Sequence, residues 1–312
     1  MADPVTTSTP SAESRPAAPP AQAPSRIGVV VHPSRSIDEP LRLLRAWTEA
    51  HGVDVVQIPV PHNQRQVAEE GDAAESDLIV SIGGDGTTLA ALRSGAGADR
   101  PVLGVACGSL GALANVSGDD LPAALDRFSR GQWQPRRFPA LAITRPEGSP
   151  LFALNDATVL RAGGGQARLT VLVDGTLYAR MAGDGAVVST QLGSSGYAIS
   201  AGGPLLAPGV DGFVLTPLPQ HGGFAPPLVV GPQAVLELDL GSGYSGGRLE
   251  IDGQVADEHV SSLTITLRPD VATMVSFRDQ EPPLSGLRRR GIILDSPRMV
   301  IELERGPDSC PE

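Results

Sequence analysis

The segment Gly83-Gly84-Asp85-Gly86-Thr87 combines the residue types that a phosphate-binding loop needs. Its glycines let the backbone turn sharply and approach a ligand with no side chain in the way. An apolar strand is expected before the segment and a helix after it, so free N–H groups and the positive helix end would face an anion. The segment is neither a Walker motif nor a Gly-x-Gly-x-x-Gly fingerprint. The sequence therefore predicts a phosphate site on Gly83, Gly84, Gly86 and Thr87.

Asp85 is the residue of this loop that indicates a reaction. A carboxylate beside phosphates is electrostatically unfavourable unless it acts on a proton or on a metal ion. It could take the proton from an attacking hydroxyl, or it could help to hold Mg²⁺. The alternative is a plain tight turn in which the carboxylate accepts backbone hydrogen bonds. The strand–loop–helix context favours Asp85 as a catalytic residue.

Two later segments carry polar groups that suit a nucleotide. The amide and carboxylate of Asn155-Asp156 can bind the two hydroxyls of a ribose, although strand ends often carry such pairs for structural reasons. Residues 184–197 lead from an expected strand into a Gly/Ser loop and a short helix, a second helix start compatible with an anion. Ser194, Ser195 and Tyr197 supply hydroxyls there, and Tyr197 also supplies a stacking face. A capped helix with a core tyrosine is the alternative.

Other reaction types find little support. No Gly-x-Ser-x-Gly elbow precedes a helix, which argues against a serine hydrolase, and a lone loop histidine such as His221 indicates nothing by itself. No cluster of histidines or carboxylates has metal-ligand spacing, so no protein metal ligand is predicted. Cys107 and Cys310 are too few for a disulfide framework or a zinc site, which favours a reducing cytoplasm.

The elements that must position these residues follow two successive patterns. Helical spacing alternates with solidly apolar runs, which predicts a parallel sheet with right-handed crossovers; the runs are 27–31, 53–58, 78–82 and 101–105. Beyond Phe138 short strands follow one another, with hairpin turns at Asp174-Gly175 and Asp252-Gly253. Further strands are expected at 235–240, 263–267 and 273–277. We predict a Rossmann-like α/β domain followed by a β-rich antiparallel domain.

Composition and charge indicate the domain boundaries and argue against nucleic acids and membranes as partners. The predicted divisions are a disordered tail, an α/β nucleotide-binding domain, a β-rich substrate-binding domain and a C-terminal segment that could pack back on the first domain; they span residues 1–25, 26–137, 138–277 and 278–312. The net charge of −11 argues against nucleic-acid binding. No stretch approaches the roughly 20 apolar residues of a membrane span, and the opening lacks a secretory signal core.

Taken in order, these segments resemble the NAD kinase family, with the diacylglycerol and sphingosine kinases as distant relatives that share the first loop. The resemblance runs from about Ile27 to Phe277, and it also includes Gly202-Gly203-Pro204 and Thr216-Pro217 with His221. It implies transfer of the ATP γ-phosphoryl group to the 2′-hydroxyl of the adenosine ribose of NAD, which gives NADP. Catalysis would then rest mostly on positioning and on charge neutralisation by Mg²⁺.

The resemblance also implies roles for the residues that match the family pattern. Asp85 would be the base or would position the hydroxyl, and Asn155-Asp156 would hold the substrate ribose. The loop around Ser194 and Ser195 would line the site of the substrate nucleotide.

Three further residues match the family pattern at more distant positions. His221 is expected among the nucleotide-binding residues. Asp184 and Tyr197 match positions that complete the site of a neighbouring subunit in family oligomers. A homodimer or homotetramer is therefore expected.

Besides Gln220, which replaces a proline before His221, four positions depart from the usual family pattern. Ala106 replaces an asparagine, and Ala112 replaces an aromatic residue that packs on adenine. Gln191 and Leu192 interrupt the usual Thr-Pro-Thr-Gly run. These changes reshape the acceptor pocket and leave Asp85 in place. Two alternatives therefore stay open: a kinase of the same fold acting on a nucleoside, a sugar-like metabolite or a lipid, and a non-catalytic nucleotide sensor. The sequence also leaves open ATP against polyphosphate as donor and NAD against NADH as acceptor.

Overall fold

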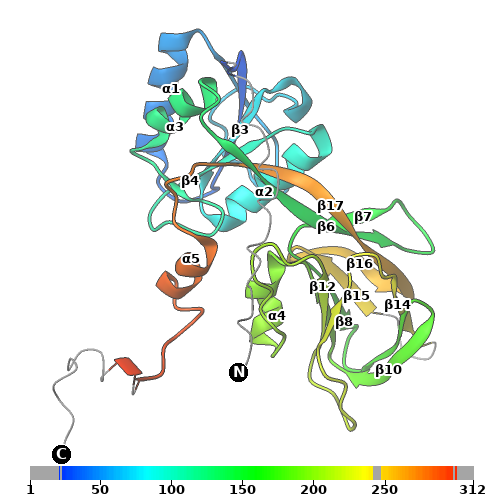
Figure 1. Ribbon diagram of the computed structural model, residues 1–312. Helices are drawn as coiled ribbons and strands as arrows, with labels where there is room; N and C mark the ends of the chain where they lie inside the picture. Colours follow the sequence, from blue (N-terminus) through cyan, green and yellow to red (C-terminus); the bar gives the residue numbers. More distant parts are fainter. Residues whose placement is uncertain (1–20, 22, 242–246, 298, 301–312) are drawn as a thin grey trace, which may run out of the picture.

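The computed structural model describes residues 21, 23–241, 247–297 and 299–300 of the 312-residue chain (Figure 1). Most of the predicted tail, residues 1–25, therefore lies outside the described residues, as do residues 301–312. Within the described residues, no helix is both long and apolar enough to cross a membrane.

The first part of the chain builds four parallel strands in the spatial order β2-β1-β3-β4. Their bounds are Asp54–Gln57, Arg26–Val31, Leu78–Gly83 and Val102–Ala106. Strands β3 and β4 are buried throughout, as their continuous apolar runs predict for a sheet covered on both faces. The helices α1 and α3 pack on one face of this sheet, and α2 packs on the other. These helices span Asp38–His51, Leu121–Ser129 and Asp85–Ala98.

Two long strands, β6 (Gln134–Thr144) and β17 (Ser262–Ser276), run between the two parts of the molecule (Figure 1). They pair with each other in antiparallel register, and β17 also meets β4 in parallel at Met274. The sheet of the first domain is therefore mixed, and it continues as one 11-stranded sheet into the second domain. The two separate strands expected at 263–267 and 273–277 are one strand, with a register shift between Arg268 and Ala272.

The second part of the chain is antiparallel and packs two sheets against each other. One is six-stranded, in the order β13-β12-β11-β8-β15-β16, and the other is the far end of the long sheet, β10-β9-β14. A large apolar core fills the space between them. In the order just given, the nine strands span Leu228–Val230, Phe213–Pro217, Gly185–Ser189, Asp156–Arg161, Gly247–Ile251, Gln254–Val260, Thr176–Gly183, Ala167–Val173 and Leu236–Leu240.

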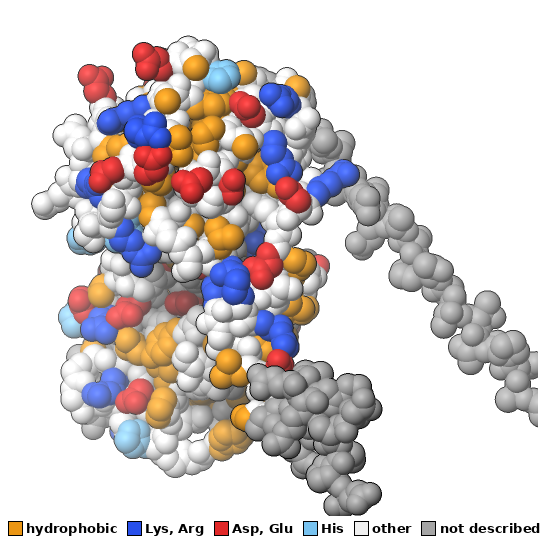
Figure 2. Space-filling view, turned by 90° about the vertical axis from the view of Figure 1, so that its left-hand side faces the viewer, with side chains coloured by type: hydrophobic (Ala, Val, Ile, Leu, Met, Phe, Trp, Pro, Cys, Tyr) orange, Lys and Arg blue, Asp and Glu red, His pale blue; other side chains and the backbone are white. Residues whose placement is uncertain are grey.

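Both predicted hairpins form at Asp-Gly turns, where Asp174 and Asp252 have φ angles of 50° and 49°. The α/β domain followed by an antiparallel β-rich domain is thus confirmed. The remaining elements are short: β5 (Val116–Ser117), β7 (Leu151–Ala153), α4 (Tyr197–Ser200), α5 (Pro283–Arg289) and the single 3-10 turns Ala73–Glu75 and Gly193–Ser195. Figure 2 shows two lobes, with acidic and basic side chains scattered over this face rather than gathered in one patch.

Candidate functional site

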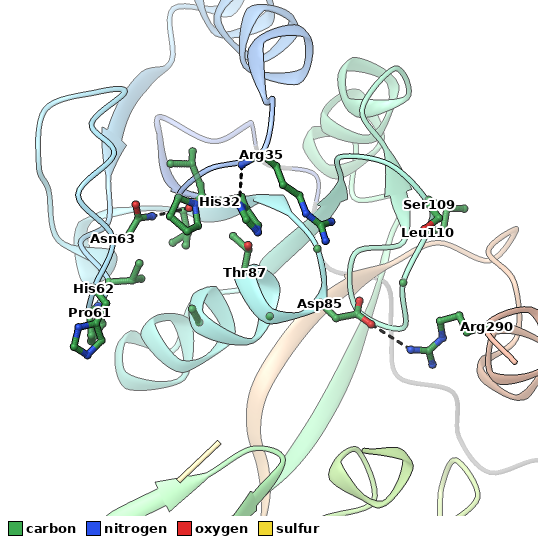
Figure 3. A pocket seen from close by; sticks show the side chains of 18 residues that line it. His32, Arg35, Pro61, His62, Asn63, Asp85, Thr87, Ser109, Leu110 and Arg290 are labelled. Carbon is green, nitrogen blue, oxygen red and sulfur yellow. Dashed lines mark hydrogen bonds and ion pairs between the residues drawn. The ribbon is translucent and has the colours of Figure 1, made fainter. Parts of the chain in front are cut away.

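The predicted phosphate loop joins the end of β3 to the start of α2 and borders a cavity of about 530 Å³ (Figure 3). Gly84, Asp85, Gly86 and Thr87 all line this cavity. Gly83 lies beneath them, where an added Cβ would meet the Thr87 hydroxyl at 2.3 Å. Helix α2 has no side-chain cap, so the N–H groups of its first turn remain available to a bound anion.

Four donors hold the carboxylate of Asp85 in place. Its Oδ1 accepts the N–H groups of Leu113 and Ala114 at 2.9 and 3.0 Å, and its Oδ2 accepts the N–H of Ala112 at 2.9 Å. The fourth donor is Nη1 of Arg290, 3.3 Å from Oδ2. The sequence left a local tight turn as the alternative for Asp85, but its backbone donors lie 27 to 29 residues further along the chain. These hydrogen bonds therefore join two loops and hold a carboxylate that faces the cavity.

The backbone of the loop 108–114 must approach Asp85 very closely to donate these hydrogen bonds. A Cβ on Gly111 would lie 1.9 Å from Oδ1 of Asp85, so any side chain there would displace the carboxylate. The structure gives Gly111 a physical function, which is to admit the carboxylate.

A second cation reaches the phosphate loop from the segment after β1. Nη1 of Arg35 lies 3.4 Å from the place that a Gly84 Cβ would occupy, and its guanidinium has no ion pair with any described residue. The nearby ring of His32 accepts the N–H groups of Ser34 and Arg35 through Nδ1. Desolvation first, and then the charges of Arg35 and Arg65, lower the pKa of His32. The positive charge that faces this side of the loop therefore comes from Arg35, with a neutral imidazole beside it.

The predicted ribose-binding pair, Asn155-Asp156, lies at the start of β8 and is fixed through Asp252. The carboxylate of Asp252 accepts the N–H groups of Leu154, Asn155 and Asp156 at 3.1, 2.7 and 3.2 Å. Asp252 also forms an ion pair with Arg93 of α2. The helix that begins at Asp85 is therefore tied directly to the Asn155-Asp156 segment. Sequence reasoning had read Asp252 only as a hairpin turn and had not singled out Arg93.

The side chains of this pair line neither of the two cavities described here, but they have unused hydrogen-bonding capacity. The carboxamide of Asn155 has no hydrogen-bond partner among the described residues, and Oδ1 of Asp156 accepts only a long hydrogen bond, 3.5 Å, from Thr158. Desolvation, reinforced by the negative charges of Asp252 and Glu250, raises the pKa of Asp156 to about 6. Near neutral pH Asp156 is therefore a carboxylate with unused acceptor capacity.

The Gly/Ser loop divides into a structural and a cavity-facing half. The hydroxyl of Ser194 is buried; it donates to the carbonyl of Gln191 at 2.7 Å and accepts the N–H of Leu206 at 3.0 Å. Ser195 instead lines a smaller cavity, to which Arg290 also contributes. Three of the four departures from the family pattern line that same cavity: Ala112, Gln191 and Leu192.

The remaining predicted residues lie outside both cavities. Asp184 forms an ion pair with Arg161 at 2.9 Å, Tyr197 is 45% exposed, and His221 lies on an exposed loop. The expected role of Asp184 and Tyr197 at a neighbouring subunit's site stays a prediction, as does that of His221 in nucleotide binding. Among the described residues, no three His, Cys, Asp or Glu side chains gather as a metal cluster.

Comparison with known proteins gives one consistent result. Residues 25–133 match the family model of the ATP-NAD kinase N-terminal domain, and residues 154–265 match that of the ATP-NAD kinase C-terminal domain. An NAD kinase of Gemmatimonas aurantiaca is 35% identical over 214 residues, which cover 65% of this chain and 73% of that protein.

Two solved structures share the fold. Yeast NADH kinase, crystallised with NADH, has a TM-score of 0.72 at 19% identity and covers 89% of each chain. An NAD kinase from Archaeoglobus fulgidus, crystallised with ATP, has a TM-score of 0.67 at 26% identity and covers 86% of this chain and 100% of its own.

Proposed function

Because this chain belongs to the NAD kinase family, we propose that it transfers the γ-phosphoryl group of ATP to the 2′-hydroxyl of the adenosine ribose of NAD, giving NADP. The observation that carries the proposal is Asp85, a carboxylate fixed at the first residue of an uncapped helix and facing a cavity. Catalysis of such a transfer consists mostly of positioning and of charge stabilisation, which this arrangement can supply.

The donor phosphates bind at the start of α2. The free N–H groups of the first turn and the glycine backbone at Gly84 and Gly86 contact the phosphate oxygens. Arg35 contributes a guanidinium that no described acidic residue neutralises, so its charge is available to the triphosphate. Thr87 adds a hydroxyl at the cavity wall.

The acceptor ribose binds on the side of the second domain. The Asn155 amide donates to one hydroxyl and the Asp156 carboxylate accepts from the other, because both side chains have unused hydrogen-bonding capacity. Ser195 contributes from the smaller cavity. Asp85 orients the 2′-hydroxyl and takes its proton as the oxygen attacks phosphorus.

Magnesium fits this scheme through the donor rather than through a protein cage. Mg²⁺ usually keeps several waters and is held by one or two carboxylates together with substrate phosphates. Asp85 lines the cavity beside the phosphate loop, but hydrogen bonds occupy its oxygens, so the ion would be held by the phosphates and its waters, with the charge of Asp85 nearby. When bound there with the triphosphate, the ion would neutralise charge that develops on the phosphate oxygens.

A second candidate is a kinase of the same fold with a different acceptor. Ala112, Gln191 and Leu192 line one small cavity, so the departures from the family pattern are concentrated where an acceptor would bind. The phosphate loop and Asp85 are unaffected by these changes. The homodimer or homotetramer and the cytoplasmic location stay predictions.

The decisive experiment incubates the purified chain with ATP, Mg²⁺ and NAD and measures NADP with an NADP-specific dehydrogenase. We expect NADP that depends on both substrates; reactions that lack NAD or ATP are the controls. Parallel reactions with NADH and with polyphosphate define the acceptor redox state and the donor. ATP consumption with other hydroxyl compounds but not with NAD would support the second candidate, and ATP binding without any transfer would support a sensor.

A further inference from the structure

Arg290 lies where the two cavities of the site meet. It lines the larger cavity beside the phosphate loop, and it also lines the smaller cavity beside Ser195. Figure 3 shows its guanidinium pointing from the end of α5 toward Asp85. A phosphoryl group that passes from a donor on the loop to an acceptor on the second domain must cross this junction. Arg290 is the last of three consecutive arginines, 288–290.

The four donors to Asp85 are not equivalent. Three are backbone N–H groups of a loop whose residues Leu113 and Ala114 are buried, so they cannot leave without rearranging the core. Arg290 is the fourth and most distant donor, at 3.3 Å, and it is the only one on a side chain. Its side chain makes only two hydrogen bonds with the described residues, to Asp85 and to the carbonyl of Gly286, so it can leave Asp85 without displacing any backbone group of the loop 112–114.

The hydrogen-bonding capacity of Asp85 makes this movement necessary. The two oxygens of a carboxylate offer about four lone-pair sites. Leu113 and Ala114 occupy Oδ1, and Ala112 and Arg290 occupy Oδ2. An acceptor hydroxyl can therefore donate to Asp85 only if Arg290 withdraws from Oδ2.

The guanidinium of Arg290 also has unused donors. Its Nε donates to the carbonyl of Gly286 at 3.2 Å and its Nη1 to Asp85, while its Nη2 has no partner among the described residues. A planar guanidinium with free donors matches the paired oxygens of a phosphoryl group. The base of the side chain is held in place, because Arg289 donates to the carbonyl of Leu110 at 2.9 Å and Leu287 is buried.

We infer that Arg290 is a catalytic residue that binds the transferred phosphoryl group, and that its shift from Asp85 to the donor releases Oδ2 for the acceptor hydroxyl. In the step, the acceptor oxygen bonds to the γ-phosphorus as the bond to the β–γ bridging oxygen breaks. The bridging oxygen keeps the electron pair and leaves as part of ADP. The hydroxyl proton goes to Oδ2 of Asp85. Donor binding thereby prepares the base, and Asp85 stays occupied until the donor is present.

This role rests on the proposed function for the identity of the donor, so its test measures nucleotide binding without an acceptor. Titration calorimetry compares Mg²⁺ with a non-hydrolysable ATP analogue and Mg²⁺ with ADP on the full chain. We expect Arg290→Gln to weaken binding of the ATP analogue about 10- to 100-fold and binding of ADP less than about 2-fold. Only the γ-phosphoryl group, which ADP lacks, loses a charged hydrogen bond. The matched control is Arg288→Gln, whose exposed side chain pairs with Asp295 away from both cavities and which should bind both nucleotides like the wild type.

A second variant separates a lost contact from a damaged fold. Arg290→Ala should recover affinity for the ATP analogue, but not for ADP, when free guanidinium ion is added, which a purely structural role would not allow. The role would be overturned if Arg290→Gln weakened binding of the ATP analogue and of ADP equally, or if it left both unchanged. It would also be overturned if guanidinium ion did not restore binding of the ATP analogue to Arg290→Ala. Wild-type chain that binds ATP but makes no NADP would overturn the proposed acceptor and leave the role of Arg290 standing.

Discussion

Two aspartates of this molecule have the same hydrogen-bonding partners in number and kind, but they lie in different surroundings. Asp85 and Asp252 each accept three consecutive backbone N–H groups and each pair with one arginine. The side chain of Asp252 is 2% exposed, whereas that of Asp85 is 35% exposed and lines the larger cavity. The hydrogen-bond donors are the same in number and kind for both carboxylates, so only the access of Asp85 to a cavity distinguishes it as the proposed catalytic residue.

The two carboxylates also fix two different loops relative to one helix. Asp85 is the first residue of α2 and holds the loop 112–114, and Arg93 of the same helix holds Asp252 and through it residues 154–156. The predicted phosphate loop and the predicted ribose-binding pair are thus both held by one helix. A site of this kind needs its reacting groups fixed to within about an ångström, which a shared helix can provide.

The largest expected effect is the loss of activity in Asp85→Asn, which should leave stability nearly unchanged. The amide keeps the shape of the carboxylate but cannot take the proton of the acceptor, so we expect kcat to fall about 10³-fold. The free energy of unfolding should fall by only about 1 kcal/mol, because the side chain is partly hydrated. NADP formation and urea unfolding measure the two effects. Activity within 10-fold of wild type would remove Asp85 as the base.

Asp252→Asn should show the reverse pattern. Removal of this buried charge leaves Arg93 without its partner, which costs about 3 kcal/mol, the lower end for a broken buried pair because Arg93 is 36% exposed. We expect kcat to stay within about 3-fold, while KM for NAD rises as residues 154–156 loosen. The control is Asp279→Asn, whose ion-paired carboxylate is 71% exposed and should cost less than about 1 kcal/mol. Equal free energies of unfolding for Asp252→Asn and Asp279→Asn would contradict a structural role for the Asp252 carboxylate.

The turns that carry these two aspartates could be predicted from the sequence, but the distant residues that bind their carboxylates could not. Both Asp252-Gly253 and the phosphate loop were identified because glycine and aspartate have strong local preferences at turns. The partners of the two carboxylates lie 97 and 205 residues away, for Asn155 and Arg290, and no periodicity connects them. Strand β17 was divided for the same reason: Arg268-Pro269-Asp270 looks like a turn locally, and pairing with β6 carries the strand through it.

A third aspartate sharpens the comparison, because Asp156 is partly buried without the donors that Asp85 and Asp252 possess. Desolvation, with the nearby charges of Asp252 and Glu250, raises the pKa of its carboxyl from 3.8 to about 6. Folding therefore favours the protonated form. The favourable contribution of that form is complete below about pH 4 and is lost as the pH rises through 6, so the ionised Asp156 destabilises the chain at pH 7.

Asp156→Asn should accordingly stabilise the chain at pH 7 by about 2 kcal/mol, and this gain should shrink as the pH falls from 6 toward 4. The same change removes the negative charge and replaces one of the two acceptor oxygens by an NH2 donor, which weakens the hydrogen bond from a ribose hydroxyl, so KM for NAD should rise about 10-fold. In the wild type KM should rise as the pH falls below 6, whereas in the variant it should stay flat over that range. Unfolding and initial-rate measurements between pH 5 and 8 check both effects. A stabilised variant with unchanged KM would mean that Asp156 does not bind the acceptor ribose. The acceptor site would then lie nearer Ser195 than Asp156.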